Sequence, residues 1–471
     1  SAEIRRMIEL ATERIVRYLE TLPEQRAVDT DEALERSEEL IEDLPEEGTD
    51  LEALLDRLFE RWIPKGFNAA SPGYLAYIPG GGLVQSAAAD LIASSINRYV
   101  GVFAAAPPLA QLETNVVRWF AKIVGLPSGS GGVLTTGGSM ANLIAVVTAR
   151  RERLPENFLR GTIYVSDQVH HSVVKAAILA GFPARNIRSI ETDETFAMRI
   201  DQLSEAIDAD RAERMSPFMV VASAGTTNTG AIDPLEEIAD LASAESLWFH
   251  VDAAYGGFFM LTERGKRRLR GIERADSLSL DPHKGLFVPY GSGSLLVRDL
   301  GALRRAHSVH ADYLPDMQQD DQRVDFCEIS PELSRGFRGL RVWLPIKLAG
   351  IDAFRSALDE KLDLASHAHE RLLEIEEVEL VAAPQLSVVA FRWKPAGVDG
   401  EELDDLNREL LRRVNERGRV YLTGTKLRDR FTIRICVLSF RTHGDRIEMA
   451  LEDIEEAMSA LTRDRSPGRA L

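Results

Sequence analysis

Apolar residues in the first 60 positions recur at intervals of three and four, which is the spacing of one face of a helix. The pattern predicts two amphipathic helices, and neither can bury its apolar stripe alone. Each stripe is therefore expected to pack on the main body of the protein or on a second subunit. The two stripes are Ile4, Met7, Ile8, Ala11, Ile15 and Leu19, and Leu51, Leu54, Leu55, Leu58 and Phe59.

Between about residues 66 and 300 the pattern changes to short, almost continuous apolar runs. Runs of this kind are typical of strands buried on both faces of a mostly parallel sheet. The stretches between them predict crossover helices, such as Asp233–Ala242 with proline in its first turn. The fold expected is an α/β domain with helices on both faces of the sheet. The four clearest runs are Thr162–Ser166, Pro217–Ser223, Leu247–Asp252 and Ser277–Leu280.

The last part of the chain predicts a smaller α+β domain. Leu386–Trp393 and Phe431–Leu438 alternate as strands do, and helical patterns follow at about 401–417 and 445–462. A polar, irregular stretch over 301–340 separates this part from the large domain. The predicted division is a helical segment over 1–65, a large α/β domain over 66–345 and a small α+β domain over 346–471.

Composition and charge reduce the number of possible functions. The 471 residues are enough for two or three domains, and a formal charge of −18 argues against binding to nucleic acid or to an anionic membrane surface. Cys327 and Cys436 are the only cysteines, which excludes a disulfide framework and a multi-thiolate metal site. No spacing of His, Asp and Glu predicts a metal site, and no membrane-length apolar run or secretory leader is found. These features indicate a cytoplasmic protein.

Thr135–Asn142 is a glycine-rich turn that opens a helix. Its free N–H groups and the helix dipole converge on one point, which makes it a candidate phosphate site. It has neither the ending of a P-loop nor the glycine spacing of a dinucleotide fold. By itself, such a turn is as often structural.

Asp252 ends a buried apolar strand, at the edge of the sheet where ligands bind in open α/β folds. A carboxylate there is costly to bury unless it meets a cation. A pyridinium nitrogen would serve, because the carboxylate keeps it protonated and the protonated ring accepts electrons. A helix cap or a loop ion pair is the alternative.

Lys284 follows another buried strand through a proline-containing turn, Asp281–Lys284. Its amine is expected to enter the same crevice, where a lowered pKa would let it form a Schiff base. Most lysines are solvated surface charges, so position decides the interpretation. His170, just after the strand Thr162–Ser166, is a candidate to lie over a planar cofactor, although it or the adjacent His171 is equally interpretable as structural.

Together these motifs resemble the group II pyridoxal-phosphate decarboxylases of fold type I, the aromatic L-amino-acid decarboxylase family. The resemblance runs from about residue 60 to the C-terminus. Its ordered motifs are Ala76–Pro79, Gln111–Glu113, Ser166–Gln168, Gly225–Thr227, His250–Tyr255 and Asp281–Lys284.

The resemblance implies a role for each matching residue. Lys284 would form the Schiff base with pyridoxal 5'-phosphate, Asp252 would pair with the pyridine nitrogen, and His170 would stack on the ring. Ala254 would pack against the other face of the cofactor. The residues that would hold the phosphate and ring are Gly138, Ser139, Thr227, Asp281 and His283.

The resemblance also implies a catalytic loop after residue 310, in which Tyr313 returns a proton once carbon dioxide has left. Phenylalanine at this position marks the related aldehyde synthases, so Tyr313 favours simple decarboxylation. A homodimer is implied, with the N-terminal helices clasping the partner. The function expected is decarboxylation of an L-amino acid, aromatic by family default, although Gly80 and the stretch 100–103 depart from the family pattern near the substrate.

Three alternatives stay open at this point. An aldehyde synthase would release ammonia and consume oxygen, and an aminotransferase would convert the cofactor to its amine form. A non-catalytic protein with an inherited site is disfavoured by the presence of Tyr313, His170 and Lys284. Arg434 is interpretable as a ligand for a substrate carboxylate or as part of a structural ion pair, and Cys327 is interpreted as structural.

Overall fold

The computed structural model describes residues 1–309 and 323–465. The chain forms two compact units. The larger one comprises residues 82–366 and 382–389, and the smaller one comprises residues 1–81, 367–381 and the chain from 390 onward.

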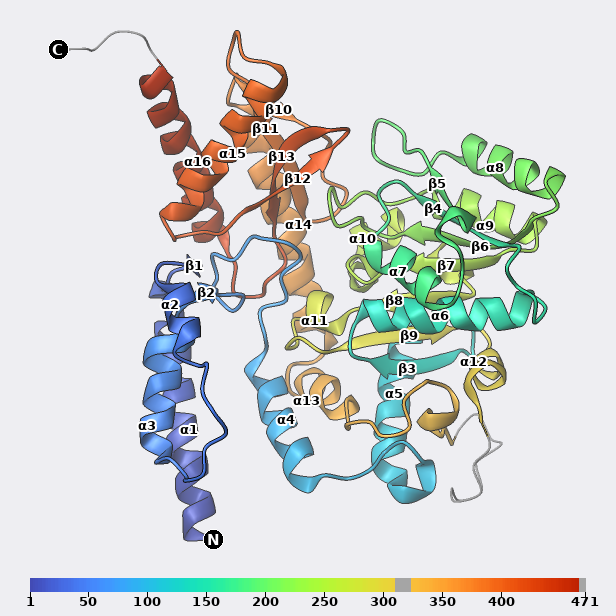
Figure 1. Ribbon diagram of the computed structural model, residues 1–471, viewed down its shortest axis with the longest axis horizontal. Helices are drawn as coiled ribbons and strands as arrows, with labels where there is room; N and C mark the ends of the chain where they lie inside the picture. The colour runs from blue at the N-terminus through green and yellow to red at the C-terminus, as the bar shows by residue number, and fades with distance from the viewer. Residues whose placement is uncertain (310–322, 466–471) are drawn as a thin grey trace. The chain divides into compact units, whose positions relative to one another are not determined.

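A seven-stranded sheet is the centre of the larger unit (Figure 1). Strand β9 runs antiparallel to both of its neighbours, and the other neighbouring pairs are parallel. The predicted mostly parallel α/β sheet is thereby confirmed. In spatial order the strands are β3 (Gly131–Thr135), β9 (Gly293–Val297), β8 (Ser277–Leu280), β7 (Trp248–Asp252), β6 (Ser216–Ser223), β4 (Gly161–Ser166) and β5 (Ile187–Ile190).

Helices cover both faces of this sheet because the strands are apolar on both sides. In β4, Ile163 and Val165 join the core cluster beneath α6 and α7, whereas Tyr164 points the other way and donates to Asp210 of α8 at 2.7 Å. Figure 1 shows α6 lying over the strands. The helices are α4 (Val84–Ile96), α5 (Pro107–Ile123), α6 (Gly138–Arg153), α7 (His171–Leu179), α8 (Ile200–Ala212), α9 (Leu235–Ala244), α10 (Glu263–Arg268), α11 (Pro282–Gly285), α12 (Leu300–His307), α13 (Gly339–Ala349) and α14 (Ile351–Leu373), the last shared with the smaller unit.

A fully buried ion pair joins α5 to the segment that leads into α13. Glu113 on α5 pairs with Arg335, and both side chains are 0% exposed. The second carboxylate oxygen of Glu113 accepts the N–H of Gly339 at 2.9 Å, and Arg335 also donates to the carbonyl of Leu134 on β3 at 3.1 Å. The pair thus ties three elements together at the edge of the sheet.

The smaller unit contains a four-stranded sheet packed with long helices. Arg434 on its strand β13 is buried and donates to the Thr423 hydroxyl at 3.1 Å and to the Tyr77 carbonyl at 3.2 Å. The strands are, in order, β10 (Val378–Leu380), β11 (Val388–Trp393), β13 (Arg430–Cys436) and β12 (Thr423–Leu427), and a separate pair is β1 (Val28–Asp29) with β2 (Gly66–Phe67). The helices are α1 (Ala2–Thr21), α2 (Ala33–Glu38), α3 (Leu51–Arg57), α15 (Gly400–Glu416) and α16 (Gly444–Arg465).

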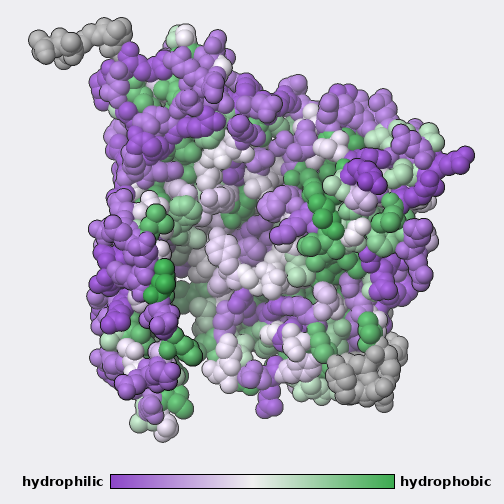
Figure 2. All heavy atoms as spheres, viewed as in Figure 1, coloured by the Kyte–Doolittle hydropathy of each residue, from purple (hydrophilic) through white to green (hydrophobic). Residues whose placement is uncertain are grey.

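Helices α1 and α3 pack against each other but leave apolar side chains exposed. Arg14 pairs with Asp56 at 2.7 Å, yet Ile4 is 60% exposed and Met7 is 50% exposed. Figure 2 shows hydrophobic side chains along this helical pair. The expected apolar stripes are therefore present on the surface of the smaller unit.

Among the described residues, none of the helices has the length and apolarity needed to cross a membrane.

Candidate active site

The parallel strands of the large sheet and β3 end at one edge, and the loops that follow them form a cavity of about 330 Å³. Binding at this edge is typical of open α/β sheets. All but one of the residues that the sequence assigned to the site line this cavity: Gly138, Ser139, His170, Thr227, Asp252, Ala254, Asp281, His283 and Lys284. The exception, Tyr313, lies outside the described residues.

The glycine-rich turn comes directly after β3 and opens helix α6 into the cavity. The first N–H groups of a helix have no intrahelical acceptor, so a 16-residue helix such as α6 presents donors and a positive dipole end at this point. A side chain at Gly138 would be crowded. A Cβ atom there would lie 3.1 Å from the Cβ of Ala254 and 3.2 Å from Oδ2 of Asp281.

Lys284 reaches the cavity from the short helix α11, which follows β8 after a single residue. Its Nζ lies 3.0 Å from Oδ2 of Asp281, and the Asp281 side chain is almost fully buried. The other carboxylate oxygen of Asp281 has no hydrogen-bond partner among the described residues. His283 donates through Nδ1 to the Ser292 carbonyl, and burial lowers its pKa.

Asp252 stands at the end of β7, in register with Ser279 on β8. Its Oδ1 accepts the Ser279 hydroxyl at 2.9 Å, and its Oδ2 accepts the amide of Asn142 at 3.0 Å. Burial by itself would raise the pKa of this carboxyl. The positive charge of Lys284 and the bond from Asn142 outweigh burial, so the pKa lies below its ordinary value and the group is ionised at neutral pH.

His170 caps the start of α7 and lines the cavity, whereas the adjacent His171 is exposed and does not line it. The Nδ1 atom of His170 lies 2.7 Å from the Ser172 hydroxyl. Burial lowers the pKa of His170, and the charge of Lys284 lowers it further. The imidazole is therefore neutral at neutral pH.

These residues fit a ligand with a phosphate, a protonated ring nitrogen and an aldehyde. The helix N-terminus suits the phosphate, the ionised Asp252 suits the ring nitrogen, and Lys284 supplies the primary amine. The buried Asp281 oxygen without a partner is a further sign that the cavity is built around a polar group. Within the part of the chain that the structure describes, no cluster of three metal-ligating side chains is found.

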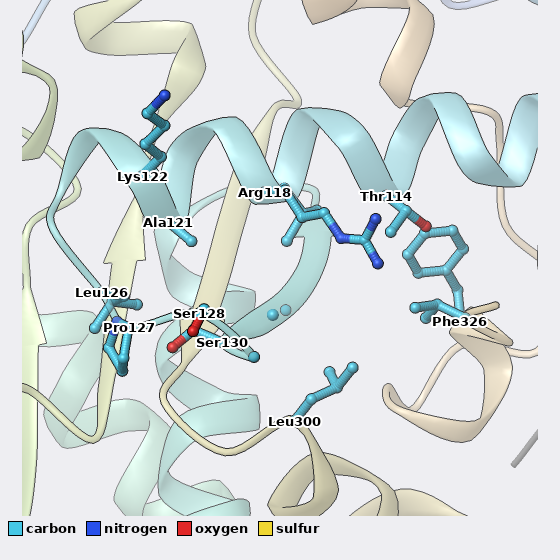
Figure 3. Close-up of a pocket in the computed structure, with 15 residues that line it drawn as sticks. Thr114, Arg118, Ala121, Lys122, Leu126, Pro127, Ser128, Ser130, Leu300 and Phe326 are labelled. Atoms are coloured by element: carbon cyan, nitrogen blue, oxygen red, sulfur yellow. The ribbon is translucent and has the colours of Figure 1, made fainter. Parts of the chain in front are cut away.

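A larger cavity of about 710 Å³ lies elsewhere in this unit, between α5 and the loop before β3 (Figure 3). Arg118 points into it, and Lys122 points away from it. The residues that line it include neither a histidine nor a carboxylate. The smaller cavity is the candidate active site because it brings together a lysine, two histidines and two buried carboxylates.

Asn142, Ser172 and Ser279 are among the polar residues at the site that were missed from the sequence. A signal was present for Asn142, because it follows Gly138 by four residues and so shares its face of α6. A signal was also present for Ser279. It lies two residues after Ser277, and alternate residues of a strand share one face, so both serines lie on the same face of β8.

Fold and site together fit the class of α/β enzymes that bind a phosphorylated, ring-containing cofactor. The comparisons with known proteins show which family the chain belongs to. The family model described as the pyridoxal-dependent decarboxylase conserved domain matches residues 35–394. An aromatic-L-amino-acid decarboxylase of Bacillus atrophaeus is 35% identical over 447 residues, covering 94% of this chain and 92% of the relative.

Solved structures agree. The crystal structure of Oryza sativa TDC with PLP and tryptamine superimposes with a TM-score of 0.93 at 28% identity, covering 98% of each chain. That of Rhodiola rosea 4-hydroxyphenylacetaldehyde synthase gives a TM-score of 0.90 at 26% identity, again covering 98% of each chain.

The chain belongs to the pyridoxal-dependent decarboxylase family. It is a pyridoxal-phosphate-dependent enzyme that decarboxylates an amino acid, as the resemblance implied.

Proposed function

We propose that this enzyme decarboxylates an aromatic L-amino acid to the amine and carbon dioxide, with Lys284 carrying the cofactor. The observation that supports this most directly is the meeting of Lys284, Asp252 and the Gly138 turn in one cavity. The aromatic substrate is supported by the relatives, which include an aromatic-L-amino-acid decarboxylase and a structure that holds tryptamine.

Pyridoxal phosphate, when bound, supplies a ring that accepts the electrons left behind by carbon dioxide. The chain's own groups orient that ring. Asp252, held ionised, keeps the ring nitrogen protonated. The backbone at Gly138 and Ser139 and the side chain of Thr227 hold the phosphate.

The remaining cavity residues enclose the ring and the lysine. His170, neutral and anchored at the start of α7, would lie over one face of the ring, and Ala254 would pack against the other. Asp281 holds the Lys284 amine in the cavity, and His283 supports this turn by its bond to the Ser292 carbonyl.

Tyr313 is proposed as the group that returns the proton to the substrate carbon. The proposal rests on the sequence, since Tyr313 lies outside the described residues. A second activity, oxidative formation of an aldehyde, is the alternative, and it is supported by the likeness to an aldehyde synthase. Tyrosine at position 313 favours the amine.

We further propose a homodimer in the cytoplasm. The exposed apolar residues of α1 and α3, among them Ile4 and Met7, support a role of residues 1–65 in clasping a partner subunit. The proposed division continues with a cofactor-binding domain over 66–345 and a small domain over 346–471. An acidic chain with two free cysteines suits the cytoplasm.

The proposed substrate and lysine are tested by incubating the protein with each amino acid in turn and measuring carbon dioxide and amine. We expect amine from an aromatic amino acid. Lys284→Ala should abolish both the product and the visible absorbance of the bound cofactor, whereas Lys347→Ala, an exposed lysine of the same unit, should change neither. Retention of the absorbance in Lys284→Ala would remove Lys284 from its role.

Tyr313→Phe separates the two activities. If Tyr313 returns the proton, its replacement lowers the amine output and raises the aldehyde output, with release of ammonia and uptake of oxygen. Unchanged products in this variant would show that another group is the proton donor.

A further inference from the structure

A row of buried polar side chains continues from Asp252 into the interior of the large unit. Asn142 is at its centre, 1% exposed, on the α6 turn that follows Gly138. Its Nδ2 donates to Oδ2 of Asp252 and to the hydroxyl of Ser172, each at 3.0 Å. Its Oδ1 lies 3.1 Å from Nε2 of His250. One amide therefore contacts three side chains.

The direction of each hydrogen bond follows from Asp252. An ionised carboxylate only accepts, so the NH₂ group of Asn142 faces it and the carbonyl oxygen of Asn142 faces His250. That oxygen also only accepts, which requires a proton on Nε2 of His250. The other ring nitrogen of His250 lies 2.8 Å from the Ser277 hydroxyl, and the Ser277 oxygen receives the indole N–H of Trp248 at 2.8 Å.

His250 is thus fixed as the neutral form with its proton on Nε2. Its ring is 1% exposed, and burial lowers its pKa to about 4 in spite of the nearby Asp252. The Ser277 hydroxyl donates its own proton to Nδ1. Every polar atom of the imidazole then has a partner, as a buried ring requires.

A second branch leads from Asn142 to His170. The Ser172 oxygen accepts from Asn142, so the Ser172 hydroxyl donates to Nδ1 of His170, 2.7 Å away. The backbone N–H of Ser172 donates to the same Nδ1 at 3.3 Å. With two donors on Nδ1, the neutral ring of His170 carries its proton on Nε2.

We propose that Asn142 is a positioning residue, whose single amide sets the orientation of the Asp252 carboxylate and the proton position on both His170 and His250. The inference rests on the proposed function for what Asp252 and His170 do to the cofactor. The hydrogen-bond directions themselves do not depend on any ligand. Asn142 lies in the lining of the cavity next to Asp252, and its proposed role is exerted through Asp252, Ser172 and the two histidines rather than on a reacting atom.

The chemical identity of the amide matters more than its size. In Asn142→Asp the NH₂ donor is lost, and two carboxylates face each other across the position of the present bond, so that one of them holds a proton. The Ser172 hydroxyl then has a carboxylate to donate to and no longer serves Nδ1 of His170. In Asn142→Leu the branched shape and the number of side-chain heavy atoms are kept, and all three bonds disappear.

The test measures imidazole ¹⁵N resonances of the cofactor-free protein, with His170 and His250 assigned from single substitutions. In the wild type we expect both rings to be neutral with protons on Nε2. In Asn142→Asp we expect His170 to lose that single form, and in Asn142→Leu we expect His250 to lose it, because the partner of its Nε2 proton is gone while both Ser172 donors to His170 remain. Asn186→Asp is the matched control, since Asn186 is an equally buried amide of the same unit and bonds only to the carbonyls of Leu159 and Gly161.

In the cofactor-bound protein, we expect both Asn142 variants to bind pyridoxal phosphate about tenfold more weakly, as the loss of a bond to a charged group implies. Their kcat should fall by a larger factor than their KM rises. A wild-type His170 with its proton on Nδ1 would overturn the proposal, whether or not the variants fold. So would folded variants whose resonances match the wild type. A failure of the proposed function would give a different result: the imidazoles of His170 and His250 would have the expected protonation forms, but the protein would bind no cofactor.

Discussion

The ion pair between Glu113 and Arg335 gives a quantitative prediction about stability. Glu113→Gln keeps the shape of the side chain but leaves the guanidinium of Arg335 buried without a counter-charge. Both side chains are 0% exposed, so solvent does not compensate. Breaking a buried pair by removing one partner costs about 3 to 5 kcal/mol, and we expect the free energy of unfolding to fall by that amount.

The structure adds reasons to expect the upper part of this range. Arg335 loses its ion pair with Glu113 while its guanidinium stays 4.7 Å from the centre of the Phe326 ring, and its Nε and Nη1 already have no hydrogen-bond partner among the described residues. In the variant Arg335 keeps its bond to the Leu134 carbonyl, but its charge and two poorly satisfied nitrogens stay buried without the carboxylate. Replacing both residues, as Glu113→Gln with Arg335→Met, removes the charge itself and should restore about 2 kcal/mol or more of the loss.

The assay is urea denaturation at a fixed protein concentration, because urea does not screen charge. Asp405→Asn is the control. Asp405 pairs with Arg408 at 2.8 Å, but the two side chains are 71% and 42% exposed, so a change within about 0.5 kcal/mol is expected. The reasoning is refuted if Glu113→Gln costs no more than this control, or if the double variant is no more stable than Glu113→Gln alone.

Two further predictions concern the cavity and its support. Gly138→Ala should weaken binding of pyridoxal phosphate by about tenfold in a titration, because the new methyl group crowds Ala254 and Asp281. Gly444→Ala, whose methyl group would have nothing within 4 Å, should leave the affinity unchanged, and equal affinities of the two variants would contradict the crowding. The pKa of His250 is about 4 in the folded protein, against an ordinary value of 6.5, so the unfolded chain takes up a proton first as the pH falls. The free energy of unfolding should therefore fall by about 3 kcal/mol as the pH is lowered from 6.5 to 4. Denaturation at several pH values should show a shallower acid slope for His250→Gln, and an unchanged slope would show that His250 does not contribute.

The apolar runs predicted the buried strands closely, because those strands are covered on both faces and their sequences are correspondingly simple. Leu247–Asp252 corresponds to β7 with one residue of difference, and Ser277–Leu280 corresponds to β8 without any. Strand β3 was not predicted because it begins with two glycines, which resemble a turn. The structure shows why one is needed, since a Cβ atom on Gly132 would lie 2.0 Å from the Leu295 carbonyl oxygen of β9.

The start of one helix was predicted slightly too early relative to its proline. The crossover helix was expected to hold Pro234 in its first turn, but α9 begins at Leu235 and Pro234 is the flanking residue. Helix ends depend on the capping bonds of a few groups, which apolar spacing does not record. The residues expected at the site meet in one cavity, and this meeting could be predicted because each follows a recognisable strand or turn.

The contacts of the supporting residues could not be predicted for a different reason. Ser172 and Ser279 are small polar residues of a common kind, and spacing along one strand or helix does not say what they contact. Their meaning depends on strand register, which places Ser279 beside Asp252, and on the packing of α6 against α7, which places Asn142 beside Ser172. Those relations are tertiary.

The loops that line the cavity come from β3, β4, β6, β7 and β8, so the cavity exists only when most of the large sheet is assembled. A ligand held there binds the folded chain and not the unfolded one. At a free concentration one hundred times its dissociation constant, such a ligand adds about 2.7 kcal/mol to the stability of the whole unit. The stability of this protein in a cell would then depend on the supply of its cofactor, and a shortage of cofactor would destabilise the folded enzyme as well as stop its activity.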